Sequence, residues 1–240
     1  MSRLHIESIP KAPGQRLSFS PPSPQAHASI RRRSLALLTV AVAIFVLAVL
    51  SRVAHGQEAA AIGRIGHVAG EVTLLRGAHS LPATTGTVVY EEDALATGPD
   101  GRAELVCADG STVVLGSDTA VSIATFAPPT AGPGRALLDL IDGILRLTLS
   151  AGRTWQSFEV RSATAVASVR STDWIMDAHR ATTAVFVVDG RVAVDSRAGL
   201  GGIVLAAGQG TDVRAGEAPT APKNWGQKRI DDVLARTSLP

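Results

Sequence analysis

The sequence is poor in cysteine and in aromatic residues. A single cysteine, Cys107, stands among 240 residues, which excludes an intrachain disulfide and a zinc site built on cysteine pairs. Aromatic residues make up 4% of the chain and are scattered, whereas single-stranded nucleic acid is bound by clustered aromatics in a basic groove. The fold must therefore be held by its apolar core, and a domain of about 150 residues is large enough for that.

The excess of basic charge lies at the N-terminus. The formal net charge is +2, but residues 1–56 hold seven basic residues and one acidic residue. The remainder carries 16 basic and 20 acidic residues, a net charge of −4. A mildly acidic domain gains nothing from the release of phosphate counterions. We therefore expect no nucleic-acid partner.

Patterns typical of catalysis or metal binding are also missing. The sequence has no Gly-x-Ser-x-Gly elbow and no phosphate-binding loop. Three of the six histidines, His5, His27 and His55, lie in or beside the N-terminal leader. The other three show no metal-ligand spacing; they are His67, His79 and His179. Distant residues can still converge in a fold. On these patterns we expect no catalytic residue, metal or cofactor, and a protein that is not an enzyme.

An uncharged apolar run follows three arginines. Eleven of the sixteen residues at 35–50 are Leu, Ile, Val or Phe, and Arg31, Arg32 and Arg33 precede them. Insertion of such a run into a membrane is favourable, and the arginines hold its N-terminal end in the cytoplasm. We therefore expect the rest of the chain to face the periplasm, and residues 1–33, which are rich in Pro and Ser, to be disordered.

Two interpretations of residues 34–54 remain, a membrane anchor and a cleaved signal peptide. Sixteen helical residues span about 24 Å, which is short of the ~30 Å hydrocarbon core. The run is also longer than the usual signal-peptide core of about 7–15 residues. The sequence therefore predicts either an inner-membrane anchor with a periplasmic C-terminal domain or a cleaved periplasmic protein.

Alternating apolar residues from 62 to 216 predict short strands. Leu145, Leu147 and Leu149, for example, share one face of such a segment. Aspartate-glycine pairs between alternating segments favour tight hairpin turns, because such turns need φ > 0. The four pairs are Asp100-Gly101, Asp109-Gly110, Asp142-Gly143 and Asp189-Gly190. The predicted fold is all-β, a two-layer sandwich or β-roll of short antiparallel strands.

Residues 217–240 predict a linker and a short helix. Trp225, Ile230 and Val233 give a rough apolar stripe, and Asn224 is placed to cap the helix. The helix either docks on its own β-domain or binds a partner. We favour docking, because an apolar stripe at helical spacing usually buries against its own fold.

Several short motifs follow one another along this domain. Residues 103–116 predict a strand, an Asp-Gly-Ser turn and a second strand, and residues 93–97 have an Asp-x-hydrophobic-x-Thr pattern. Residues 143–146 read Gly-hydrophobic-hydrophobic-Arg, 164–174 run from Thr-Ala to Val-Arg-Ser-Thr, 187–194 predict a late hairpin and 205–209 end in Ala-Gly-Gln. In this order the motifs resemble those of the FecR family of periplasmic signalling domains.

Two substitutions separate this chain from the family pattern, and we expect one part of the pattern to be absent. Glu92 and Ser171 stand where the family has glycine, and glycine at such positions indicates φ > 0 or a close backbone approach. Sigma-regulating relatives also carry a helical cytoplasmic anti-sigma domain. The segment before residue 34 is too short for a packed domain of that kind.

The resemblance implies a candidate interaction or structural signature at Arg170, Ser171, Thr172, Asp173 and Trp174. Its charges either relay partner binding or form a structural pair that orders the turn. We expect a non-catalytic recognition or signalling module that binds another cell-envelope protein. The alternatives are a structural or glycan- or peptidoglycan-binding envelope protein, and a regulator of an extracytoplasmic-function sigma factor that acts through a partner.

Overall fold

The computed structural model describes residues 61–129, 132–152 and 155–239, and most of them are in strands. This confirms the prediction of a mainly β chain with one short C-terminal helix. The predicted segments 1–33 and 34–54 lie outside the described residues. Within the described part, no helix is long and apolar enough to cross a membrane.

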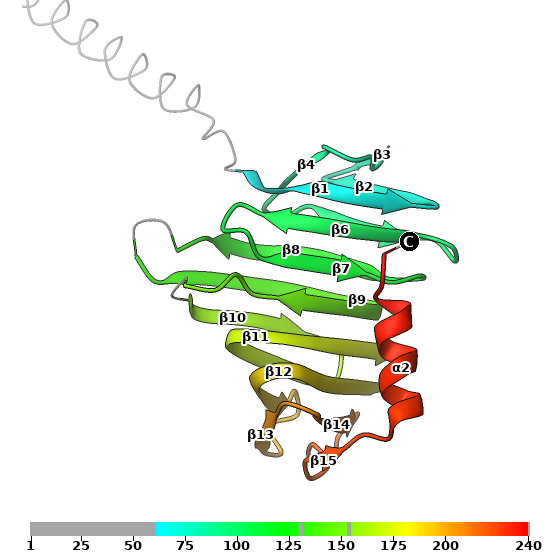
Figure 1. The fold of residues 1–240 in the computed structure, drawn as a ribbon. Coiled ribbons are helices and arrows are strands. Elements are labelled where there is room, and N and C mark those ends of the chain that lie inside the picture. Colours follow the sequence, from blue (N-terminus) through cyan, green and yellow to red (C-terminus); the bar gives the residue numbers. More distant parts are fainter. Residues whose placement is uncertain (1–60, 130–131, 153–154, 240) are drawn as a thin grey trace, which may run out of the picture. The chain divides into compact units, whose positions relative to one another are not determined.

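The strands and the helix follow one another along the chain, with β9, β11 and β12 much longer than the rest (Figure 1). Their bounds are β1 (Ala61–Ala69), β2 (Val72–Arg76), β3 (His79–Pro82), β4 (Val88–Tyr90), β5 (Ala94–Thr97), β6 (Arg102–Cys107), β7 (Thr112–Leu115), β8 (Ala120–Ala127), β9 (Gly134–Thr148), β10 (Trp155–Arg161), β11 (Ala165–His179), β12 (Thr182–Ser196), β13 (Gly202–Ala206), β14 (Gln209–Arg214), β15 (Lys223–Asn224) and α2 (Gln227–Arg236).

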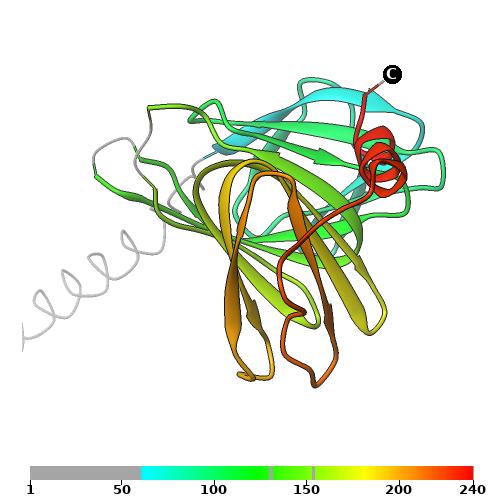
Figure 2. The same cartoon turned by 60° about the horizontal axis from the view of Figure 1, so that its bottom comes forward.

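All of these strands belong to one hydrogen-bonded sheet, which folds into two facing layers (Figure 2). The first layer runs β4-β1-β6-β7-β9-β11-β12-β14-β15, and α2 lies on its outer face, so we call it the helix layer. The second runs β3-β2-β5-β8-β9-β10-β11-β12-β13, and we call it the open layer. The long strands β9, β11 and β12 belong to both layers.

Each long strand bends where it passes from one layer to the other. Strand β9 pairs with β8 up to Asp142 and with β11 from Gly143. Strand β11 leaves β10 after Val169, and its pairing with β12 slips before Thr172, which lies opposite Gly190. Gly143 and Gly190 have φ values of 94° and 87°, a conformation that costs glycine nothing. The bends therefore form one corner across three adjacent strands.

Three of the four predicted hairpins are corrected by this topology. Asp142-Gly143 and Asp189-Gly190 lie inside β9 and β12, where the chain bends without reversing. Asp100-Gly101 joins β5 of the open layer to β6 of the helix layer, and these strands do not pair with each other. Asp109-Gly110 is the turn between β6 and β7, which are antiparallel neighbours. A hairpin needs its two flanking strands to pair, and at the other three sites the second half pairs elsewhere.

The strands also differ from the predicted short antiparallel pattern. Strands β9, β11 and β12 have fifteen residues each, and β10 pairs with β9 in parallel. The parallel pair arises because the connection after β9 begins in the helix layer and ends in the open layer. A hairpin connection is therefore impossible there.

The core lies between the two layers. Leu74, Leu95 and Leu138 point inward from the open layer and meet Leu105, Leu145 and others from the helix layer, each at most 2% exposed. Burial of this inner face, at about 25 cal/mol per Å² of apolar surface, is what joins the layers without a disulfide.

The C-terminal helix docks on the outer face of the helix layer. Val233 of α2 and the preceding Trp225 form a second apolar cluster with Ile144, Ile175 and Phe186. The expected cap is wrong, since Asn224 lies in β15 and the residue at the helix start is Gly226, with no side-chain cap bond. The apolar stripe therefore packs α2 against the sheet without a side-chain cap at the helix start.

Candidate functional site

The family signature builds the corner in β11. Trp174 is fully buried in the core, and the Thr172 hydroxyl donates to the Arg191 carbonyl oxygen of β12 at 3.2 Å. Arg170 and Ser171 belong to the same strand, but their side chains lie outside the described residues. The signature thus begins on the open layer and ends in the core beneath the helix layer.

Asp173 is paired with Arg146 of β9. The guanidinium donates from Nε to Oδ1 at 2.8 Å and from Nη2 to Oδ2 at 2.6 Å, and the Thr148 hydroxyl donates to Oδ1 at 3.2 Å. The hydrogen bonds that Arg146 donates to Asp173 raise the pKa of Arg146. A two-pronged pair of this kind fixes geometry as well as charge. The Asp173 carboxylate therefore has a structural partner on the neighbouring strand.

A groove lies on the outer face of the open layer, beside the corner. It has a volume of about 630 Å³ and is lined by residues of β10, β11, β12 and β13. Glu159, Ser168, Ala193 and Val204 form one row across these four strands, each opposite the next. Small side chains in the middle of the row and longer ones at its ends make the surface concave.

The charges of the groove are separated along its length. Glu159 stands on β10, where it accepts a hydrogen bond from the Ser157 hydroxyl at 2.7 Å, and Arg191 stands on β12. Arg191 and Asp195 form none of the salt bridges found among the described side chains. The groove therefore offers one acidic and one basic group over a floor of small residues.

The opposite outer face is closed by the C-terminal segment. Arg236 of α2 forms a two-pronged pair with Asp177, at 2.6 and 3.0 Å. Arg229 pairs with Asp212 of β14 and lies 3.6 Å from the Trp225 ring centroid. These contacts hold α2 at both ends, so α2 covers this part of the helix layer, whereas no described helix covers the open layer.

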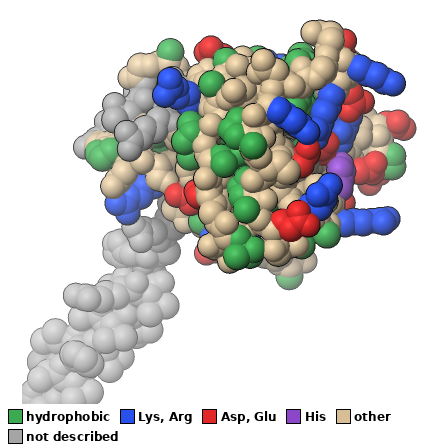
Figure 3. Space-filling view, turned by 90° about the horizontal axis from the view of Figure 1, so that it is seen from below, with side chains coloured by type: hydrophobic (Ala, Val, Ile, Leu, Met, Phe, Trp, Pro, Cys, Tyr) green, Lys and Arg blue, Asp and Glu red, His purple; other side chains and the backbone are tan. Residues whose placement is uncertain are grey.

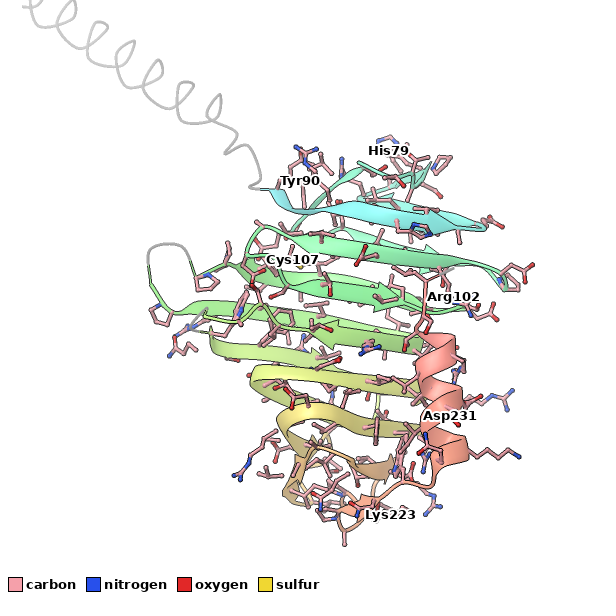
Figure 4. All side chains as sticks on the ribbon, in the orientation of Figure 1. His79, Tyr90, Arg102, Cys107, Lys223 and Asp231 are labelled. Atoms are coloured by element: carbon pink, nitrogen blue, oxygen red, sulfur yellow. The ribbon has the colours of Figure 1, made fainter. Side chains whose placement is uncertain are left out.

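Asp93, the carboxylate of the family's Gly-Asp element, protects the edge strand β4. It is 1% exposed and accepts two bonds from Arg76, at 2.8 and 2.7 Å, and one from the Tyr90 backbone N–H at 2.8 Å. Arg76 also donates to the Val88 carbonyl at 2.8 Å and lies over the Tyr90 ring. Tyr90 and Lys223 mark the two opposite ends of the sheet (Figure 4).

The backbone conformation at Glu92 explains why the family pattern has glycine at this position. Its φ is 68°, in the left-handed region that costs a residue with a Cβ roughly 1–2 kcal/mol. The sequence pattern indicated such a backbone, and the structure has it with glutamate in place. The turn before Asp93 therefore keeps its geometry at some cost in stability.

Cys107 and Asp109 are both buried. Cys107 is 4% exposed, and burial, with a smaller contribution from Asp109, raises the pKa of its thiol, so the reactive thiolate is disfavoured. Asp109 is engaged by Ser111 and by the Trp155 indole N–H at 3.2 Å. No group of three metal-ligating side chains occurs in the described part of the chain.

Comparison with known proteins confirms the resemblance to the FecR family for part of the chain. Residues 93–193 match the model of the FecR protein family. A FecR domain supports a signalling or regulatory role. No curated protein matches the chain.

Two solved structures are similar in part. Both are crystal structures, at 1.65 and 2.50 Å resolution, of a candidate anti-sigma factor from Parabacteroides distasonis ATCC 8503, and each has 18% identity and a TM-score of 0.49. The match covers 59% of this chain and 64% and 63%, respectively, of theirs. The chain therefore spans less than two thirds of the length of these relatives.

Sequence reasoning found the signature but not its surroundings. Arg146 stood in a quoted family motif, yet nothing local indicated Asp173 as its partner, because the two are 27 residues apart. Ser168 and Ala193 also stood in family motifs, at 164–174 and 187–194, but nothing indicated that they line a groove, and Glu159 was missed altogether. They meet through strand register, which alternation within each strand does not reveal.

Proposed function

We propose that this chain is a non-catalytic recognition module of FecR type that works in the cell envelope and faces the periplasm. The open-layer groove, lined by Glu159, Ser168, Arg191 and their neighbours, binds a segment of another envelope protein. The observation that carries the proposal is the position of the groove. It adjoins the corner built by the family signature, on the face that no helix of the described residues covers.

The electrostatics of the molecule support this assignment. Asp93, Asp109 and Asp173 are all engaged by donors that order turns or join strands. In the groove, by contrast, Arg191 has no ion-pair partner among the described residues. A partly apolar groove with a few separated charges suits an extended peptide segment, since charges at its two ends fix register and direction.

The periplasmic location rests on the sequence. The apolar run at 35–50 and the arginines before it favour export of everything that follows. A fold held by its core, with no disulfide among the described residues, is compatible with that compartment.

Photo-crosslinking in intact cells tests the proposal. A benzophenone amino acid in place of Ser168 puts the probe on the groove floor, and the matched control carries it at Val106, which is 37% exposed on the helix layer. We expect an adduct with one envelope protein from position 168 and not from position 106. Adducts of equal yield from both positions, or none from position 168, would contradict the groove.

Co-sedimentation with purified peptidoglycan tests the main alternative. A groove that recognises a protein segment predicts no sedimentation above that of the Ser168→Arg variant, whose longer side chain blocks the floor. Sedimentation of the wild-type chain that this variant abolishes would move the function to glycan binding.

A further inference from the structure

The edge of β13 lacks the protection that the other sheet edges carry. Arg76 and Asp93 engage the backbone of β4, β3 ends at Pro82, and β15 has two residues, one of them Lys223. Charge, proline and short length are the usual means of keeping a sheet edge from pairing. Strand β13 (Gly202–Ala206) has five residues with no charge and no proline, and among the strands that the structure describes it pairs with β12 alone.

Three residues of β13 turn their backbone hydrogen-bonding groups away from β12, with Val204 at their centre. The Ser196 N–H donates to the Gly201 carbonyl, so alternate residues from 201 onward face β12 and Gly202, Val204 and Ala206 face outward. The Ala206 N–H is taken by the Gln209 side chain at 2.9 Å. Val204, 58% exposed, is therefore the central residue of the free edge.

We propose that two copies of this chain associate through β13, pairing antiparallel about a two-fold axis at Val204. The strand is chemically close to a palindrome, with Gly202 and Ala206 at its ends and Ile203 and Leu205 inside them. With this axis, Gly202 of one copy lies opposite Ala206 of the other on the outer face. Ile203 of one copy lies opposite Leu205 of the other on the core side. A C2 interface needs such self-complementarity.

Two unpaired charges support a second copy as the occupant. Arg191 lies opposite Ala206 and Asp195 opposite Gly202. In the paired edge, Arg191 and Asp195 of the other copy therefore fall on one row, three strand spacings or roughly 14 Å apart at Cα. The Asp195 carboxylate lies against Gly202, where any Cβ would collide with it. An extended Arg191 side chain of the other copy covers the rest of the distance between the two Cα atoms.

The surface at this end of the molecule fits the same interpretation. Seen from below, its middle shows hydrophobic and uncharged groups, whereas most charged side chains gather on the side of α2 (Figure 3). A contact made by one strand pair lies at the small end of protein interfaces. The association should therefore be weak and depend on concentration. The association shares Arg191 and Val204 with the groove, but it does not rest on the partner proposed for the groove.

Disulfide trapping of the full-length chain in intact cells tests the pairing. Directly opposed residues that exchange hydrogen bonds are about 5.5 Å apart at Cα, within the reach of a disulfide. The Val204→Cys variant should therefore form a covalent dimer under mild oxidation. The control is Ile141→Cys, 64% exposed on the open layer and far from β13. We expect roughly fivefold more dimer from position 204, and equal yields would overturn the proposal.

A charge exchange separates a second copy from a foreign strand. In the Val204→Cys background, Arg191→Asp should lower the dimer yield, because it places two carboxylates on one row. Adding Asp195→Arg should restore the yield. Restoration supports self-pairing, whereas failure to restore it in a variant with an unchanged circular-dichroism spectrum would contradict it. Photo-crosslinking from position 168 is measured in a separate experiment. The proposal of self-pairing through β13 and the proposal of a partner in the groove can therefore each fail while the other holds.

Discussion

Arg146 and Asp173 join β9 to β11 by two parallel hydrogen bonds on the outer face of the helix layer. One belongs to the glycine-led segment that follows the bend in β9, and the other to the signature that follows the bend in β11. Two motifs that are separate in the sequence are therefore two sides of one corner. The pair holds the corner at the point where both strands enter the same layer.

The coupling between these two residues can be measured. We expect Arg146→Ala and Asp173→Asn each to lower the free energy of unfolding, and the double variant to lower it by about 1 kcal/mol less than the sum, because the pair is partly exposed. Denaturant unfolding of the four proteins gives this value. Strictly additive losses would mean that the ion pair contributes nothing.

Replacing Glu92 with glycine should stabilise the chain. The left-handed φ of 68° burdens glutamate but not glycine, so we expect Glu92→Gly to raise the free energy of unfolding by about 1 kcal/mol. Glu92→Ala is the control, since it removes the side chain and keeps the Cβ. An equal gain in both variants would attribute the effect to charge instead of backbone strain.

Acid should loosen the contact between β14 and α2. Hydrogen bonding to Arg229 lowers the pKa of Asp212 in the folded chain. Its stabilisation is therefore complete above the unfolded pKa of about 3.9 and is lost as the pH falls through the lower folded value. At pH 7 the free energy of unfolding of the wild type should exceed that of Asp212→Asn by about 1 kcal/mol. Thermal melts between pH 7 and pH 2 should show the stabilities of the two proteins converging as the pH falls. A constant difference would contradict the assignment.

Trp225 should be the main anchor of the C-terminal segment. Its ring stacks on Phe186 with centroids 5.0 Å apart and lies under the Arg229 guanidinium. We expect Trp225→Ala to cost about 3 kcal/mol and to make the chain after β14 sensitive to protease. The exposed Leu200 provides the control, because Leu200→Ala should change stability by less than about 0.5 kcal/mol. Protease resistance equal to wild type would show that α2 is held by other contacts.

Local patterns predicted the strands but not where the chain reverses. Alternation placed Leu145 and Leu147 on the buried face of β9, and both are in the core. Asp142-Gly143 and Asp109-Gly110 look alike in sequence, yet one bends a strand and the other closes a hairpin. The difference lies in the strand that each flank pairs with, which is a non-local property.

The same limit applies to the candidate site. The glycine missing at position 92 correctly indicated an unusual backbone, because φ depends on the residue itself. The partner of Asp173 and the floor of the groove depend instead on which strands become neighbours, and no window of sequence contains that information.

Because β9, β11 and β12 each run through both layers, neither layer can come apart while the other persists. The backbone itself couples the two faces, so heat or denaturant should melt the β-domain in a single step, and an intermediate with one sheet intact should not accumulate. A force applied to the open layer would accordingly be transmitted through these strands to the helix layer, and the two layers would move together.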